Sequence, residues 1–305
     1  MNQIVFGDCR DSLRLMADLE VKAQTCVTSP PYFGLRDYGH DGQIGLEKTP
    51  DEYIAAMVEV FRCVRDVLAD DGTLWLNLGD SYNGSGPSGG PGKSYTNVGS
   101  QDTTVKRVPG LKPKDLIGIP WRVAFALQAD GWYLRQDIIW HKPNPMPESV
   151  KDRCTKAHEY VFLLSKSERY YFDSEAVKEP VQSNKGNSKS FRGGGSYTGN
   201  NAFNNHQLKE RETHGNAPHA DGTRNRRSVW TIATRPYKGA HFATFPPALI
   251  EPCVLAGSRP GDIVLDPFMG SGTTAQVALQ HGRQYLGCEL NRDYKPLQDE
   301  RLAAA

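Results

Sequence analysis

The chain has 305 residues, 38% of them hydrophobic, and a formal net charge of only +1, so attraction to nucleic acid would require a local basic region. No apolar run approaches the ~18 residues of a membrane span, the N-terminus lacks a signal-peptide core, and the cysteines show no metal-binding spacing. We therefore expect a cytoplasmic protein with reduced thiols, no metal site and no membrane contact, built as one catalytic domain with an insertion.

The N-terminal half alternates predicted strands and helices. Apolar periodicity predicts strands over 3–6, 73–78, 133–140 and 159–164, and helices over 11–19, 50–68 and 119–131. Gly7 and Asp8 directly follow the first strand, which places Asp8 at a carboxyl end. Asp8 either caps the next helix or meets a ligand there, and we favour the ligand role.

A rigid turn follows the short strand that ends at Thr28. The next residues are Ser29-Pro30-Pro31-Tyr32, and neither proline can donate a hydrogen bond to a strand ladder. A serine oxygen, a proline carbonyl and a tyrosine ring are thus held on stiff backbone. They offer two hydrogen-bond acceptors beside one stacking face, which suits a planar ring bearing an amino group. The alternative is an ordinary strand-to-loop turn with an incidental tyrosine.

Two stretches lack the composition of a core. Residues 83–107 are rich in Gly, Ser, Pro, Asn and Thr, and we expect a mobile surface loop whose Lys106 and Arg107 contact phosphates. Between 183 and 238, ten Lys or Arg face only three acidic residues. We expect a basic insertion over 183–240 that binds DNA through a set of arginines: Arg192, Arg224, Arg226 and Arg227. The alternative is a disordered, solubilising insert.

A glycine-containing loop follows the apolar strand 262–265. Asp266 is followed by Gly270 and Gly272 and then by a predicted helix over 275–280, which is how a doubly wound sheet presents a nucleotide-like ligand. The glycines let backbone approach the ligand, and Thr273 at the helix start offers free N–H groups to a carboxylate.

A second strand, over 284–288, ends at Glu289. Its distance from the glycine loop is about the twenty residues expected of an acid that grips ribose hydroxyls. A surface acid is the alternative, and we favour the ligand role.

Together these motifs resemble the DNA amino-methyltransferases, and the resemblance covers nearly the whole chain. The family's catalytic tetrapeptide matches Ser29 to Tyr32, and its cofactor loop matches Asp266 to Thr274. The Gly7-Asp8 pair, the strand 72–77 and the Phe245-Pro246-Pro247 helix start match as well. The catalytic motif precedes the cofactor motif with a variable region between them, as in the beta group.

The resemblance implies a doubly wound, Rossmann-like α/β sheet that depends on S-adenosyl-L-methionine. It implies a catalytic half over 1–182, a target-recognition insertion over 183–240 and a cofactor-binding half over 241–305. The residues it places in catalysis are Ser29, Pro30, Pro31 and Tyr32. The residues it places around the cofactor are Asp8, Thr28, Phe245, Asp266, Phe268, Gly270, Gly272, Thr273 and Glu289. The implied partner is double-stranded DNA, and a palindromic site would suit a homodimer, although nothing in the sequence fixes one.

The implied reaction is direct methyl transfer to the exocyclic nitrogen of a flipped base. Ser29 nominally indicates cytosine N4, because many adenine enzymes of the family carry Asp at this position. The whole chain, however, resembles solitary prophage-type methyltransferases, among which adenine enzymes with Ser-Pro-Pro-Tyr occur. We therefore expect adenine N6, with cytosine N4 as the alternative. RNA or protein-amide methylation would not require the basic insertion, and a catalytically dead DNA-binding module would have lost a catalytic residue.

Overall fold

The computed structural model describes residues 1–84, 110–181, 222–234 and 245–305. These residues form two compact units: a main unit over 1–176 and 227–305, and a smaller one over 177–226. The predictions for Lys106, Arg107 and Arg192 lie outside the described residues, as does most of the predicted basic insertion.

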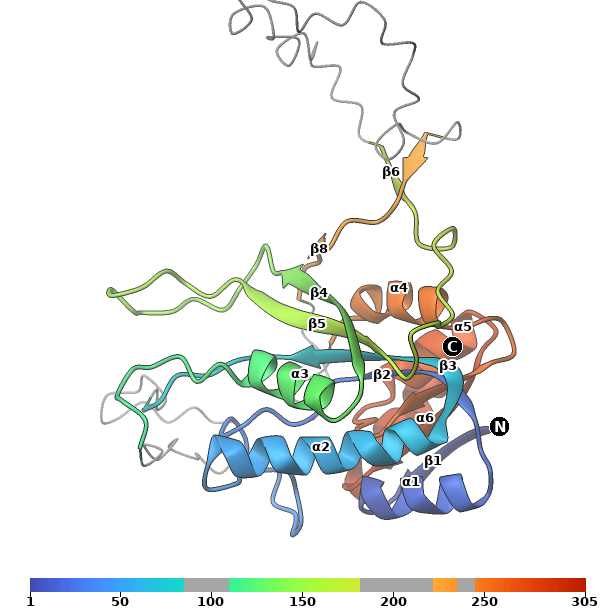
Figure 1. The fold of residues 1–305 in the computed structure, drawn as a ribbon, viewed down its shortest axis with the longest axis horizontal. Coiled ribbons are helices and arrows are strands. Elements are labelled where there is room, and N and C mark those ends of the chain that lie inside the picture. The colour runs from blue at the N-terminus through green and yellow to red at the C-terminus, as the bar shows by residue number, and fades with distance from the viewer. Residues whose placement is uncertain (85–109, 182–221, 235–244) are drawn as a thin grey trace, which may run out of the picture. The chain divides into compact units, whose positions relative to one another are not determined.

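An eight-stranded sheet organises the main unit (Figure 1). Its strand order is β1-β10-β9-β2-β3-β5-β4-β8. The first five strands are mutually parallel, whereas β5 is antiparallel to both of its neighbours. The strands are β1 (Asn2–Phe6), β2 (Ala23–Thr28), β3 (Leu68–Leu78), β4 (Tyr133–His141), β5 (His158–Ser165), β8 (Val229–Thr231), β9 (Ile263–Asp266) and β10 (Gln284–Glu289). The predicted Rossmann-like α/β fold is confirmed.

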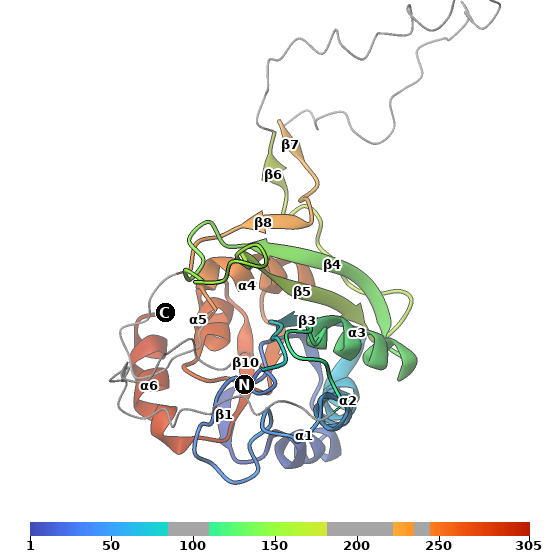
Figure 2. The ribbon, with the colours of Figure 1, turned by 90° about the vertical axis from the view of Figure 1, so that its left-hand side faces the viewer.

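Helices cover both faces of this sheet, as Figures 1 and 2 show. One face carries α1 (Cys9–Asp18), α2 (Pro50–Val67) and α3 (Ile119–Ala129). The other carries α4 (Pro247–Gly257), α5 (Thr273–Gln280) and α6 (Lys295–Ala303), the last preceded by a short 3-10 turn over Arg292–Tyr294. The central strands β2 and β3 are consequently buried along most of their length, including the polar Thr25, Thr28 and Asn77. No helix in the described residues is long and apolar enough to cross a membrane.

Two helix starts follow directly from the sequence. The Thr49 and Glu52 side chains form a reciprocal capping box at α2, with Pro50 at the first helical position. Asp8 caps α1, because its carboxylate accepts a hydrogen bond of 2.8 Å from the Arg10 backbone N–H. The capping alternative for Asp8 is therefore confirmed.

One strand of the main sheet falls inside the segment predicted as the insertion. Residues 227–234 belong to the main unit, where β8 pairs in parallel with β4 and Trp230 lies opposite Trp140. The apolar run around Trp230 is too short to stand out after the arginines that precede it. Helix α6 was also not predicted, because its polar sequence has little helical periodicity of apolar residues.

The smaller unit contains a two-stranded ribbon. β6 (Glu179–Pro180) and β7 (Thr223–Arg224) are antiparallel, and Val181 N–H donates to the Gly222 carbonyl at 2.9 Å. Arg224 forms an ion pair of 2.7 Å with Glu179. The ribbon therefore brings together the two chain ends that flank residues 182–221.

Five of the six cysteines are buried, and Cys154 is exposed. All six are free thiols. Within the described residues no group of His, Cys, Asp and Glu side chains is arranged to hold a metal ion.

Candidate active site

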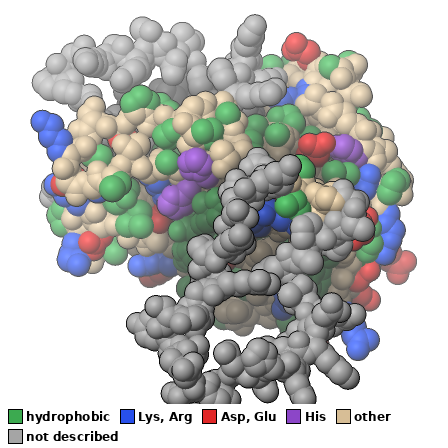
Figure 3. Space-filling view, turned by 90° about the horizontal axis from the view of Figure 1, so that it is seen from above, with side chains coloured by type: hydrophobic (Ala, Val, Ile, Leu, Met, Phe, Trp, Pro, Cys, Tyr) green, Lys and Arg blue, Asp and Glu red, His purple; other side chains and the backbone are tan. Residues whose placement is uncertain are grey.

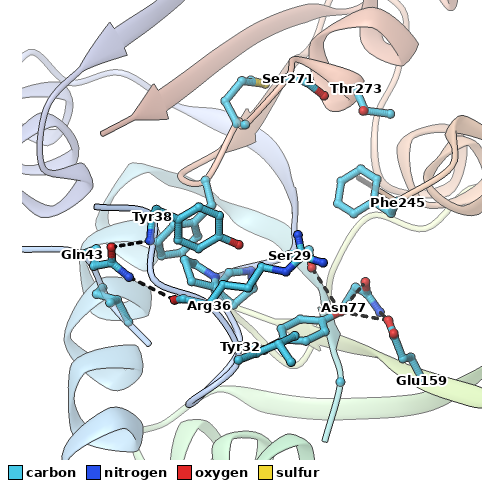
Figure 4. Close-up of a pocket in the computed structure, with 18 of the residues that line it drawn as sticks. Ser29, Tyr32, Arg36, Tyr38, Gln43, Asn77, Glu159, Phe245, Ser271 and Thr273 are labelled. Carbon is cyan, nitrogen blue, oxygen red and sulfur yellow. Dashed lines mark hydrogen bonds between the residues drawn. The ribbon is translucent and has the colours of Figure 1, made fainter. Parts of the chain in front are cut away.

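A cavity of about 820 Å³ lies where the parallel strands of the main unit end. Its walls include residues just after the carboxyl ends of β1, β2, β3, β9 and β10, and this is the edge at which open α/β sheets bind ligands. Figure 4 shows part of its lining. Ten residues predicted from the sequence line it together: Asp8, Ser29, Pro30, Pro31, Tyr32, Phe245, Phe268, Gly270, Thr273 and Glu289.

The serine end of the cavity is a fixed turn after β2. The Tyr53 hydroxyl donates to the Pro31 carbonyl at 2.8 Å, which anchors the second proline to α2. The Ser29 hydroxyl lies 3.5 Å from the Tyr32 hydroxyl. The turn therefore depends on packing from α2 as well as on the prolines.

The Tyr32 ring lies against backbone at Gly79. A methyl group at Gly79 would lie only 2.5 Å from the ring, so a side chain there would displace it. The Tyr32 hydroxyl donates to Glu159 at 2.9 Å (Figure 4). Burial, and then the Glu159 charge, raise the pKa of Tyr32 well above its usual value. The phenol thus remains a hydrogen-bond donor at neutral pH.

Glu159 connects three strands at this end of the cavity, and the sequence did not reveal it. Its carboxylate also accepts a hydrogen bond of 3.4 Å from the Asn77 amide on β3 and forms a close ion pair with Lys142 after β4. The Lys142 ammonium lies 4.2 Å from the centre of the buried Trp140 ring. These contacts arise only because β5 pairs in antiparallel fashion with both β3 and β4. No local sequence motif predicts that pairing.

The glycine end of the cavity is held by Glu289. Its carboxylate accepts hydrogen bonds from the backbone N–H groups of Gly270 at 2.7 Å and Asn291 at 2.8 Å. Burial raises the pKa of Glu289. Gly270 and Gly272 both adopt positive φ angles, 52° and 86°, which glycine tolerates best. The loop conformation is therefore tied to the acid that ends β10.

Asp266 lies beneath this loop and does not line the cavity. It is 1% exposed and accepts hydrogen bonds of 2.6 Å from the hydroxyls of both Thr28 and Thr274. Burial raises its pKa to about 6. Thr28 and Gly272 are likewise absent from the lining. The structure thus places Thr28 and Asp266 in a buried link between β2 and β9, behind the residues that face the cavity.

Asp8 completes the wall at the end of β1. Its carboxylate is held by the Arg10 guanidinium at 2.6 Å, and this hydrogen bond lowers the pKa of Asp8. The group therefore stays ionised while it both caps α1 and lines the cavity.

A loop after the serine turn forms another wall. The Gln43 side chain accepts from the Tyr38 backbone N–H at 2.8 Å and donates to the Arg36 carbonyl at 3.2 Å (Figure 4). The Tyr38 phenol points into the cavity, and burial raises its pKa.

One buried polar atom in the lining stands out. The Ser271 Oγ lies between Gly270 and Gly272 in the loop and has no hydrogen-bond partner among the described residues. Close by, Thr273 begins α5, whose first backbone N–H groups point out of the helix. A carboxylate-bearing ligand would satisfy both features, while the carboxylates of Asp8 and Glu289 suit amino and hydroxyl groups. This donor and acceptor set fits S-adenosylmethionine.

Three of the predicted DNA contacts, Arg224, Arg226 and Arg227, are among the described residues. Arg224 pairs with Glu179 in the smaller unit, and neither Arg226 nor Arg227 lines the cavity. Figure 3 shows Lys and Arg side chains scattered among hydrophobic and other side chains, with no continuous basic surface over the described residues in that view. On the face drawn in Figure 3, the described residues thus present separate basic groups.

Comparison with known proteins places this site in a family. A model described as DNA methylase, of the N6/N4 methyltransferase type, matches residues 23–300. The type II methyltransferase M.SmaI of Serratia marcescens is 49% identical over 302 residues, which cover 98% of this chain and 90% of that protein.

Two solved structures share the fold. The PvuII DNA methyltransferase, described as cytosine-N4-specific, superposes with a TM-score of 0.62 at 19% identity and covers 98% of this chain and 86% of its own. The M1.HpyAVI–SAM complex superposes with a TM-score of 0.54 at 19% identity and covers 99% and 100% of the two chains.

Proposed function

The chain belongs to the DNA methylase family of S-adenosyl-L-methionine-dependent N6/N4 amino-methyltransferases, and from this premise we propose that it flips one base out of a specific duplex site and methylates the exocyclic nitrogen. The observation that carries the proposal is that the serine turn and the glycine loop face each other across one cavity. A flipped base at the serine end and a cofactor at the glycine end would share that space.

We assign cofactor binding to the residues that line the glycine end. Glu289 would accept from the ribose hydroxyls, Asp8 from the adenine amino group, and the N–H groups before α5 would bind the carboxylate. When bound, S-adenosylmethionine supplies an electrophilic methyl group. Thr28 and Asp266 would act by holding β2 and β9 together beneath the cofactor.

The Ser29 hydroxyl and the Pro30 carbonyl would accept the two hydrogens of the target amino group. The nitrogen lone pair of a base is delocalised into the ring, and these two acceptors draw the nitrogen toward tetrahedral geometry. Its lone pair can then point at the methyl group. In this proposal, most of the rate enhancement comes from holding the amino nitrogen and the methyl group in this geometry.

The Tyr32 ring would stack on the flipped base and offset part of the unstacking cost of ~a few kcal/mol. Gly79 behind the ring, and Glu159 at its hydroxyl, fix the ring in one orientation. A ring fixed before the base arrives loses less entropy on binding it.

For the target base we propose cytosine N4. The adenine expectation depended on a resemblance to solitary enzymes. M.SmaI, which matches nearly the whole chain, is instead named a type II methyltransferase. Ser29 in the catalytic turn then remains as the discriminating feature, and it favours cytosine. Adenine N6 is the alternative that the experiment must separate.

The test is methylation of duplex DNA with labelled S-adenosylmethionine, with RNA and total protein as parallel substrates. Nucleosides from the product are identified by mass spectrometry. We expect label in duplex DNA, recovered as N4-methylcytosine. Recovery as N6-methyladenine would reverse the base assignment alone, and label only in RNA or protein would overturn the function.

We further propose that residues 183–226 read the DNA sequence. This proposal is supported by the excess of Lys and Arg in the sequence there. Because Val181 and Gly222 are hydrogen-bonded neighbours, residues 182–221 can be replaced by an Asn-Gly turn without separating β6 from β7. Unchanged site preference in this variant would contradict the proposal.

We also propose that the enzyme acts as a homodimer. Sedimentation with and without duplex DNA tests this.

A further inference from the structure

The connection between β4 and β5, residues 142–157, carries an unusual apolar side chain at the cavity. Figure 1 shows this connection extending past the ends of both strands. Met146 within it lines the cavity and is nonetheless 86% exposed. Among the exposed large hydrophobic side chains of the described residues, only Met146 and Leu35 also line the cavity. Met146 is the more exposed of the two, since Leu35 is 51% exposed.

The backbone around Met146 is stiff. Prolines stand at 143, 145 and 147, so the methionine lies between residues whose φ angles are fixed and whose neighbours are restricted to extended conformations. Prolines at such spacing reduce the entropy that the segment loses when it binds a partner. The apolar side chain is therefore presented to solvent on a rigid segment.

Side-chain contacts hold the same segment at both ends. On one side the Asn144 amide donates to the Thr234 carbonyl at 3.1 Å and accepts from the Thr234 N–H at 2.9 Å. On the other side Glu148 forms an ion pair of 2.6 Å with Arg153, whose guanidinium lies 4.1 Å from the centre of the Tyr82 ring. The position of Met146 is thus determined by the fold.

The chemistry around Met146 matches duplex DNA. Residues 142–157 contain four Lys or Arg against two acidic side chains, and both Lys142 and Lys156 line the cavity. When a base leaves the stack, it leaves an apolar gap between two base pairs, and flexible apolar side chains such as Met are the kind that proteins insert into such gaps. A gap of this kind has to lie next to the cavity that receives the base.

We propose that Met146 is a DNA wedge that enters the base stack and fills the space of the flipped base. This inference rests on the proposed base flipping, and it assigns the wedge to the β4–β5 connection. The partner is duplex DNA, and the wedge contributes when the target base is paired and stacked. It contributes less when that base is already unpaired, because the stack is then partly open.

The experiment compares Met146→Ala, Met146→Leu and Met146→Lys in the full-length enzyme, on duplexes that carry a mapped target site with the target base either paired or mismatched. Leu15→Ala is the control, because Leu15 is 57% exposed on α1 and does not line the cavity. For the alanine and lysine variants we expect kcat/KM on the paired duplex to fall about tenfold or more, with most of the loss restored on the mismatched duplex. The leucine variant should retain most of the activity.

Two outcomes would overturn the wedge. The first is full activity of Met146→Ala on the paired duplex. The second is a gain of activity in Met146→Lys, which would mean that the segment acts through phosphate attraction alone. The parent enzyme on the same duplexes separates this failure from failure of the proposed function, because an unmethylated parent reaction would remove the premise and leave no variant to compare.

Discussion

The two ends of the cavity are assembled from the chain in different ways. At the glycine end, Gly270 and Glu289 are 19 residues apart. Gly270 lies in the loop after β9 and Glu289 ends β10, which is the adjacent parallel strand. At the serine end, Tyr32 and Glu159 are 127 residues apart and meet only because β5 joins β3 in antiparallel fashion. A local motif therefore specifies the glycine end, whereas the serine end depends on long-range pairing. The two ends should be separable by mutation.

The largest separation is expected from Ser29→Ala. In the proposed mechanism, the variant removes a hydrogen-bond acceptor from the target amino group and leaves the glycine end untouched. We expect kcat to fall by about 10²–10³, by analogy with loss of one positioned polar group in other active sites. Affinity for S-adenosylmethionine, measured by calorimetry, should stay at the parental value. A matched control is Ser167→Ala, whose hydroxyl donates to the Asp70 carbonyl beyond the far end of β5. Equal losses in turnover and cofactor affinity would show that the two ends are not independent.

The second test concerns the buried link under the glycine end. Burial raises the Asp266 pKa from 3.8 to about 6, so the native state binds more protons than the unfolded state between these values. The corresponding stability is present below about pH 4 and is lost as pH rises through about 6. Asp266→Asn is neutral at every pH. Its amide can donate to the Thr274 oxygen, because that hydroxyl can turn its proton toward the Val27 carbonyl at 3.4 Å.

The free energy of unfolding of the parent should therefore decline relative to that of Asp266→Asn between pH 4 and 7, by on the order of 3 kcal/mol. Urea denaturation of both proteins at several pH values in this range provides the measurement. The pKa of the buried Glu289 is also raised, chiefly by burial and to a smaller extent by the Asp266 charge, so most of its contribution is shared by both proteins. Parallel pH curves would indicate that the pKa of Asp266 is the same in the folded and unfolded protein.

The third test acts on the glycine loop itself. A β-branched side chain is strained at the φ of 52° that Gly270 adopts, and Gly270 lines the cavity. We expect Gly270→Val to weaken S-adenosylmethionine binding at least about tenfold. Gly282→Val controls for strain alone, because Gly282 has a φ of 71°, open space around it and no place in the lining. Comparable affinity in the two variants would exclude close backbone approach at Gly270.

The same contrast explains which parts of the structure could be predicted from the sequence. Strand ends, caps and tight turns are local, so the predicted strands, the helices α1 to α3 and turn residues such as Ser29 and Gly270 emerged from periodicity and from Gly, Pro and Ser positions. Phe245 and Phe268 were expected only from the family resemblance. Glu159 was missed because a Glu at the start of an apolar strand looks like any solvent-facing acid until its partner strand is known. Asp266 looked like a ligand contact, since its place after β9 gives no sign that Thr28 and Thr274 enclose it. β8 is only three residues long and can be recognised as a strand only from its pairing with β4.

The smallest effect is expected from Glu159→Gln, which tests the serine end of the cavity. The amide keeps the volume and an oxygen that can accept from the Tyr32 hydroxyl, but it loses the charge that pairs with Lys142. The Tyr32 ring should remain between Gly79 and the cavity with a weaker hydrogen bond.

We expect kcat of Glu159→Gln to fall by about tenfold with unchanged affinity for S-adenosylmethionine. Tyr32→Phe should show a similar loss because it removes the other partner of the same bond. The double variant should be little worse than either single one, since a double-mutant cycle on one shared interaction is not additive. Additive losses would mean that Glu159 acts on the base by a route other than Tyr32. A loss of cofactor affinity in Glu159→Gln would show that the two ends of the cavity are not independent.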